Sequence, residues 1–268
     1  MKVQLSSLII NITALLLGIV SLLMPLIFPW VNGPGDMSTT MPLMISLIIV
    51  FCLIIVIIDI QSSALDTKMI AFLGVVIAIN AGLRFLENAI PGPAGFSPTF
   101  LIIILVGYTF GGQYGFLTGA LTMFTSALIT GGVGPWLPSQ MITAGWVGQS
   151  AGIIKWETQK SKGNGIFTDI FLLSLHGGIW GLLYGIIINL WFWPFLAGSQ
   201  NQAWSSTASL SQNLQHYYTY YLATSLVWDI TRAIGNVLLI LILAKPIIKI
   251  FRRFQIRFSF SYQESSDA

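Results

Sequence analysis

The sequence contains few charged residues, and this scarcity decides the class of protein. Asp, Glu, Lys and Arg make up 8% of the 268 residues, whereas hydrophobic residues make up 55%. Soluble domains carry roughly 25% charged residues, which form their solvent-exposed surface. A chain so poor in charge cannot cover a soluble core, so we predict an all-α protein of the lipid bilayer. The small net charge of +3 gives no reason to expect a nucleic-acid partner.

Motifs for catalysis, metal binding and nucleotide hydrolysis are also missing. No G-x-x-x-x-G-K-[ST] occurs, which excludes ATP binding through a Walker loop. HExxH, CxxC and GxSxG are absent, and the single Cys52 excludes an intrachain disulfide. A lone histidine in a membrane helix, such as His176, is more often a packed hydrogen-bonding residue than a ligand. We therefore expect no catalytic residues, no bound metal and no cofactor.

Long apolar runs predict eight transmembrane helices, because about 20 apolar residues cross a bilayer. The runs at 98–112 and 114–131 are short and joined only by Gly112-Gln113, and they are alternatively a tight helical hairpin. Lys2 is the only charged residue before the first run, and no A-x-A-type cleavage site follows that run. We therefore predict a retained helix and not a cleaved signal peptide. The predicted helices cover roughly residues 7–29, 41–60, 69–89, 98–112, 114–131, 139–155, 167–193 and 216–244.

Lys and Arg predict the orientation of these helices. With the N-terminus inside, every basic residue falls on the inner side except Arg84 and Arg232, which lie within predicted helices. Basic residues favour the cytoplasmic side of a membrane. We therefore predict a multi-pass protein of the cell membrane with both termini in the cytoplasm. The outer loops are then 30–40, 90–97, 132–138 and 194–215.

One outer loop, Gly131–Met141 (GGVGPWLPSQM), combines backbone freedom with stiffness. Gly permits sharp turns and Pro fixes the backbone. Non-helical backbone near membrane depth is tolerated only where it is buried in protein or lines a cavity. We expect this loop to cover a binding site. For Trp136, contact with a ligand and a place in the interfacial aromatic belt are equally good interpretations.

Charged side chains inside membrane helices are costly and indicate function by default. On the third predicted helix one polar face holds Asn80, Arg84, Glu87 and Asn88. On the last, another holds Asp229, Arg232 and Asn236. Both faces lie in the outer halves of their helices, so we expect them to meet in one outward-facing pocket. The alternative is an ion-pair network that only holds the helices together.

Small residues recur every four positions on several predicted helices. Residues of this size let membrane helices approach closely. Most of these stripes predict internal packing: Gly115/Gly119, Ala144/Gly148/Gly152 and Gly177/Gly181/Gly185. The stripe formed by Gly74, Ala78 and Gly82 points away from the Asn80/Arg84 face, and we predict that it docks a partner subunit.

Two sequence patterns resemble one protein family. The first is Gly131–Met141 followed by Gly145-Trp146-Val147-Gly148, and the second is Trp228–Asn236 (WDITRAIGN) with a later Lys245-Pro246. From about residue 68 to 250, the chain resembles the substrate-binding S component of energy-coupling factor (ECF) vitamin importers. The resemblance implies a six-helix S-component-like bundle at 66–250, two extra transmembrane helices within 1–65, and a basic cytoplasmic tail at 251–268.

The resemblance also implies a function. An S component captures a vitamin from outside, associates with a transmembrane coupling (T) subunit and two ATPase subunits, and delivers the vitamin inward by toppling. The family's first core helix presents an AxxxA-like face to the coupling subunit, for which Gly74/Ala78/Gly82 is an imperfect match. The predicted substrate-binding residues are Asn80, Arg84, Glu87, Phe96, Gly134, Pro135, Trp136, Gln140, Asp229, Arg232 and Asn236.

Other functions remain open from the sequence. A self-contained secondary transporter would use Arg84, Glu87, Asp229 and Arg232 as an ion or proton relay. An intramembrane enzyme has less support, because no nucleophile–base pair is recognisable. Among vitamins, the long loop at 194–215, rich in Trp, Asn and Gln, favours a large polar ligand such as cobalamin. Riboflavin, folate and other small vitamins remain alternatives.

Overall fold

The computed structural model describes residues 67–89, 97–134, 136–160, 165–195, 201–205 and 207–258, with residues 13, 16, 18–20 and 51. All regular secondary structure in these residues is helical. The predicted helices at 7–29 and 41–60 lie almost wholly outside this set. The elements are α3 (Thr67–Ala89), α4 (Thr99–Phe110), α5 (Gly112–Thr130), α6 (Leu137–Lys160), α7 (Ile166–Phe192), the 3-10 turn η2 (Trp193–Phe195), α8 (Leu210–Thr224) and α9 (Leu226–Phe258).

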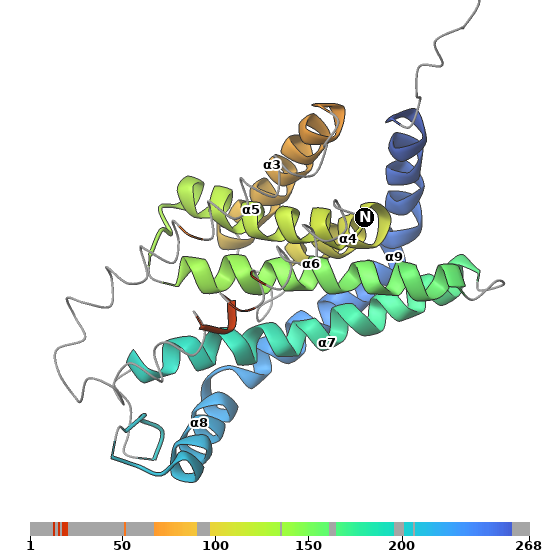
Figure 1. Cartoon of the computed structure of the whole chain (residues 1–268). Helices are drawn as coiled ribbons and strands as arrows, with labels where there is room; N and C mark the ends of the chain where they lie inside the picture. The colour runs from red at the N-terminus through yellow and green to blue at the C-terminus, as the bar shows by residue number, and fades with distance from the viewer. Residues whose placement is uncertain are drawn as a thin grey trace, which may run out of the picture.

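The helices form a bundle around α4 (Figure 1). α4 packs on α5, α6 and α9, while α3 packs on α5 and α7 packs on both α6 and α9. Ten of the 12 residues of α4 are buried. At 1.5 Å per residue this helix is only about 18 Å long, which is shorter than a bilayer core. Its apolar run therefore serves as the centre of the bundle.

Three of the described helices are long and apolar enough to cross a membrane. They are the segments Lys68–Glu87 of α3, Ile166–Phe192 of α7 and Leu226–Ile256 of α9. The two short runs predicted at 98–112 and 114–131 are separate helices, α4 and α5. Gly111 joins them with a φ of 117°, a conformation that favours glycine.

The bounds predicted for the last helix, 216–244, are wrong at both ends. α8 begins earlier, because Ser209 caps it by accepting a hydrogen bond from the Gln212 N–H in a capping box. α8 ends at Thr224, and after Ser225 the chain continues as a second helix, α9. α9 runs to Phe258, so the boundary predicted at residue 250 falls inside a helix.

The loop predicted at Gly131–Met141 is shorter than expected. α6 begins at Leu137, so Pro138, Ser139 and Gln140 are helical. Proline is tolerated in the first turn of a helix, where its missing N–H would have no helical partner. The turn proper runs from Gly131, which ends α5 in the left-handed conformation with φ 66°, to Trp136.

Glycines bring the backbones of α5 and α6 into direct contact. A Cβ atom on Gly115 would overlap the backbone carbonyl of Gly148, and one on Gly148 would overlap the backbone of Gly115. Gly119 lies in the same way against the carbonyl of Ala144. The Gly177–Gly185 stripe of α7 packs against α9. Internal packing of these stripes is therefore confirmed.

Candidate functional site

A group of polar side chains lies where α3 ends and where α4, α6 and α9 begin. Arg84 on α3 donates from Nη2 to Oε1 of Gln140 on α6, at 3.4 Å. The side chain of Arg84 is half-buried. Ser139, one position before Gln140 on α6, is buried and donates back to the Trp136 carbonyl. The structure thus joins two predicted site residues that are 56 positions apart.

Glu87 lies one turn after Arg84 on α3 and is tied to a different helix. Its Oε2 accepts hydrogen bonds from Ser97 Oγ at 2.9 Å and from Thr99 Oγ1 at 3.3 Å. Sequence analysis missed these two hydroxyls, although Thr99 begins the central helix α4. Among the described residues, no ion pair joins Arg84 to Glu87. The predicted charge network is therefore divided between α6 and α4.

Two charged residues on the polar face of α9 form an ion pair with each other. Arg232 Nη1 lies 2.5 Å from Asp229 Oδ1, and the Asp229 side chain is only 2% exposed. Tyr221 on α8 donates to the other carboxylate oxygen at 2.9 Å. A Cβ atom on Gly185 of α7 would overlap the carboxylate, so this glycine makes room for it. Arg232 also reaches the Gly181 carbonyl, at 3.4 Å.

Tyr221 belongs to α8, which is not among the membrane-length apolar helices. Burial, followed by the hydrogen bond to the Asp229 carboxylate, raises the pKa of Tyr221 above its usual value. Its hydroxyl therefore stays protonated at neutral pH and keeps donating to Asp229. Sequence analysis assigned this tyrosine no role, so it was missed as part of the site.

Tyr184 on α7 lies between the two polar faces. The guanidinium of Arg232 is 5.6 Å from the centre of its ring. The charges of Arg84, Arg232 and Glu87 all act on its hydroxyl. The hydroxyl is buried and has no hydrogen-bond partner in the described structure. The two polar faces were expected to meet, and Tyr184, which sequence analysis missed, lies between them. The sequence feature that could have indicated it is a tyrosine beside the Gly181/Gly185 stripe.

Two predicted site residues, Asn80 and Asn236, are wholly buried between helices. Asn80 donates to Thr122 Oγ1 on α5 at 3.2 Å. Asn236 donates to the Gly177 carbonyl on α7 at 3.0 Å. Each keeps an amide oxygen without a partner in the described structure. Their hydrogen bonds join α3 to α5 and α9 to α7.

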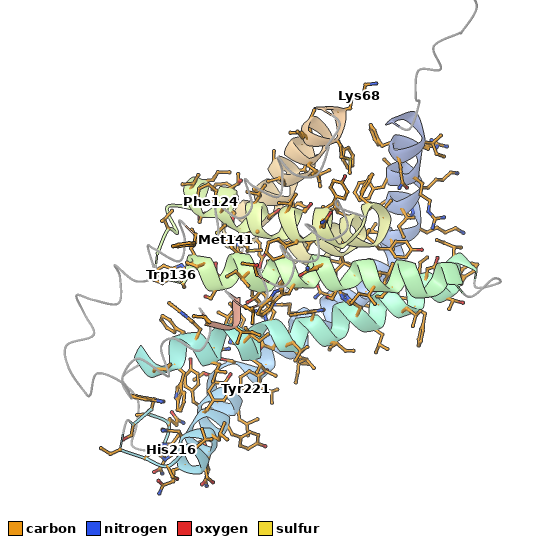
Figure 2. The ribbon with its side chains drawn as sticks, viewed as in Figure 1. Lys68, Phe124, Trp136, Met141, His216 and Tyr221 are labelled. Atoms are coloured by element: carbon orange, nitrogen blue, oxygen red, sulfur yellow. The ribbon has the colours of Figure 1, made fainter. Side chains whose placement is uncertain are left out.

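Trp136 folds back onto its own turn. Its indole N–H donates to the Gly132 carbonyl at 3.2 Å, and its ring covers Gly134 closely enough to exclude a Cβ atom there. The side chain is 38% exposed. Figure 2 shows it at the end of the bundle away from Lys68. Two other predicted residues, Phe96 and Pro135, lie outside the described residues.

The polar groups of the long loop before α8 bond within that segment. Asn213 pairs with Ser205 through both of its amide atoms, at 3.1 and 2.8 Å. The His216 ring bonds the Ala203 carbonyl at 2.9 Å, and Trp193 donates to the Gln202 carbonyl at 2.6 Å. The described part of this loop thus uses its polar atoms to fold onto α8.

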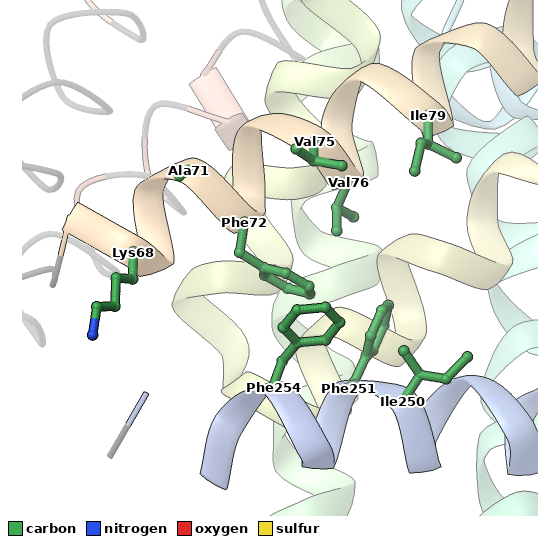
Figure 3. A pocket seen from close by; sticks show the side chains of 9 residues that line it. All are labelled: Lys68, Ala71, Phe72, Val75, Val76, Ile79, Ile250, Phe251 and Phe254. Atoms are coloured by element: carbon green, nitrogen blue, oxygen red, sulfur yellow. The ribbon is translucent and has the colours of Figure 1, made fainter. Parts of the chain in front are cut away.

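The other end of α3 carries an apolar surface. Gly74 and Ala78 are exposed, and a Cβ atom on Gly74 or Gly82 would meet nothing within 4 Å. On a neighbouring face of α3, a cavity of about 560 Å³ opens toward α9 (Figure 3). Pro246 lies inside α9, and the turns that follow it bring Phe251 against Phe72 with ring centres 5.6 Å apart. The cavity is lined by Lys68, Ala71, Phe72, Val75, Val76, Ile79, Ile250, Phe251 and Phe254.

Comparison with known proteins agrees with the all-helical fold. No curated protein and no solved structure gave a match. A family model described as "ECF transporter, substrate-specific component" matches residues 68–244, which is more than half of the chain and spans α3 to the apolar part of α9. The protein therefore belongs to the family of substrate-specific components of ECF transporters.

Proposed function

We propose that this chain captures a vitamin at the outer face of the cell membrane and passes it to a coupling subunit and two ATPase subunits. The observation that carries the proposal is the buried hydroxyl of Tyr184, which has no partner in the described structure although its ring lies 5.6 Å from the Arg232 guanidinium and the charges of Arg84 and Glu87 also act on it. A few convergent polar groups in an apolar setting are typical of small-molecule sites. The three basic residues Lys249, Arg252 and Arg253 on the last turns of α9 support a cytoplasmic position for that end.

The proposal predicts that the purified chain binds a vitamin without nucleotide or partner subunits. We expect a dissociation constant below about 1 μM, because a capture protein must retain a scarce ligand. The measurement is a titration of the B vitamins against intrinsic fluorescence, to which nine tryptophans contribute. Failure of every vitamin in the panel would overturn the capture function. The cobalamin prediction is one arm of the same panel.

The same preparation tests the secondary-transporter alternative. Vesicles that contain this chain alone are loaded with an ion gradient and supplied with the vitamin that binds. We expect no uptake until the coupling and ATPase subunits and ATP are added. Gradient-driven uptake by the chain alone would contradict the proposal and indicate an ion-coupled relay through the charged residues.

We further propose that the Gly74/Ala78/Gly82 face docks the coupling subunit. Its exposure along one side of α3 leaves room for close approach of a partner helix. Ala78→Phe should lower the recovery of coupling and ATPase subunits with the chain about tenfold, which corresponds to about 1.4 kcal/mol of lost association. Vitamin titration should be unchanged. Ile179→Phe, at an exposed position of α7, is the control; equal losses in both variants would reject this docking face.

A further inference from the structure

Arg84 is a cation that makes no direct ion pair with the described residues, although the Glu87 carboxylate lies one turn away on α3. A guanidinium has five N–H donors. In the described structure Arg84 makes one hydrogen bond, to Gln140, whose 3.4 Å length is beyond the usual range. The other arginine of the site, Arg232, is instead neutralised by Asp229 at 2.5 Å. Because a charge without a direct ion pair inside an apolar bundle is costly, the half-buried Arg84 favours an anionic partner.

Two further donors lie on neighbouring helices. Tyr184 is 7% exposed, and its hydroxyl has no partner in the described structure. Gln140 accepts from Arg84 through Oε1, which leaves its amide NH₂ group directed to other acceptors. These groups come from α3, α6 and α7. Together they offer one positive charge and several hydrogen-bond donors at one end of the bundle.

Glu87, one turn after Arg84 on α3, adds an acceptor. Both hydroxyls that bond it, Ser97 and Thr99, use Oε2. Its Oε1 makes no hydrogen bond with the described residues. The charges of Arg84 and Arg232 both act on this carboxylate. A bound molecule can therefore meet donors at Arg84, Gln140 and Tyr184 and an acceptor at Glu87.

We propose that the captured molecule carries a carboxylate, which binds Arg84 together with Tyr184 and Gln140, and a separate N–H or O–H donor that binds Glu87. The inference rests on the proposed capture function. A carboxylate fits because it is planar and singly charged, and a guanidinium binds it through two parallel hydrogen bonds. A dianionic phosphate would find only one cation without a direct ion pair and would be repelled by Glu87. A cationic molecule would be repelled by Arg84.

Pairs of molecules that differ only at the acid test this inference. The isolated full chain is titrated with biotin and biotinamide, and with pantothenate and panthenol, because both acids also carry N–H or O–H donors. Folate, riboflavin, thiamine and cobalamin complete the panel. We expect one of the carboxylates to bind, and its uncharged analogue, where the panel has one, to bind at least about 100-fold more weakly, as expected for loss of a desolvated charge pair.

The outcomes separate this inference from the proposed function. Equal binding of an acid and its uncharged analogue would overturn the carboxylate assignment and leave vitamin capture standing. Preferential binding of riboflavin, thiamine or cobalamin would have the same meaning. No binding by any member of the panel would overturn the capture function itself, and the carboxylate inference with it.

Two substitutions test the assigned residues once a binding acid is found. Tyr184→Phe keeps the ring contact with Phe100, whose centre is 4.9 Å away, and removes only the hydroxyl. Because this hydroxyl has no partner in the described structure, the melting temperature should not fall, whereas affinity for the acid should fall about tenfold. Arg84→Gln should reduce that affinity about 100-fold. Arg253→Gln, on the exposed far end of α9, is the charge-matched control; unchanged affinity in both site variants would reject the assignment.

Discussion

Asp229→Asn is expected to destabilise the bundle by about 3–5 kcal/mol, because the substitution leaves the charge of Arg232 without its partner in an apolar setting. Asn has nearly the shape of Asp, so the space beside Gly185 stays filled. Asp229 is only 2% exposed, and both of its oxygens are engaged, one by Arg232 and the other by Tyr221. The measurement is denaturant or thermal unfolding of the purified chain without ligand, followed by tryptophan fluorescence.

A double variant also removes the positive charge of Arg232, which Asp229→Asn leaves without a partner. In the Asp229→Asn/Arg232→Met double variant, the methionine has about the length of arginine and needs no counter-ion. Replacing both members of a buried pair is often close to neutral, so most of the lost stability should return. If the double variant is as unstable as the single one, the cost comes from lost packing or hydrogen bonds and the argument from charge is wrong.

Gly148→Ala is expected to cost about 3 kcal/mol or more, because the new methyl group would overlap the backbone of Gly115. A side chain in the way can rotate aside, but a helix backbone cannot. The α5–α6 pair would have to separate along its whole contact, which is the most extensive between helices of the described structure. Loss of folded protein in expression trials and a lower melting temperature are the readouts.

Gly74→Ala is the matched control for this substitution. Gly74 also lies within a helix, but a Cβ atom there would meet nothing within 4 Å. Alanine favours a helix over glycine by roughly 1 kcal/mol. The control should therefore be as stable as the natural chain or slightly more stable. A similar loss in both variants would mean that close packing between α5 and α6 is not what Gly148 provides.

The sequence predicted the helical framework well wherever local signals mark helix ends. α3, α5 and α7 lie within two residues of their predicted bounds, because glycine turns and polar loops flank their apolar runs. The break at Ser225 has no such signal: apolar residues continue across it. There the chain turns because tertiary contacts hold both sides, with Tyr221 on one helix bonded to Asp229 on the next.

For the site, helical periodicity identified the right faces but not the right partners. Spacing placed Arg84 and Glu87 together, yet each side chain reaches a different helix, α6 through Gln140 and α4 through Thr99. Such choices depend on which hydroxyl or amide the fold brings near, and spacing along one helix does not contain that information. Tyr184 was missed for the same reason, because a single tyrosine among apolar residues is inconspicuous until both polar faces surround it.

The contact between α5 and α6 also has a mechanical consequence. Where two backbones touch through Gly115 and Gly148, no layer of side chains lies between them to rearrange. We therefore expect these two helices to tilt in the membrane together, as one rigid unit. α3 and α9, by contrast, diverge beside Phe72 and Phe251, and the gap between them is bordered by side chains that can change rotamer. We therefore expect relative motion within the bundle to be concentrated at the cavity between α3 and α9, with the α5–α6 pair as the fixed surface against which it occurs.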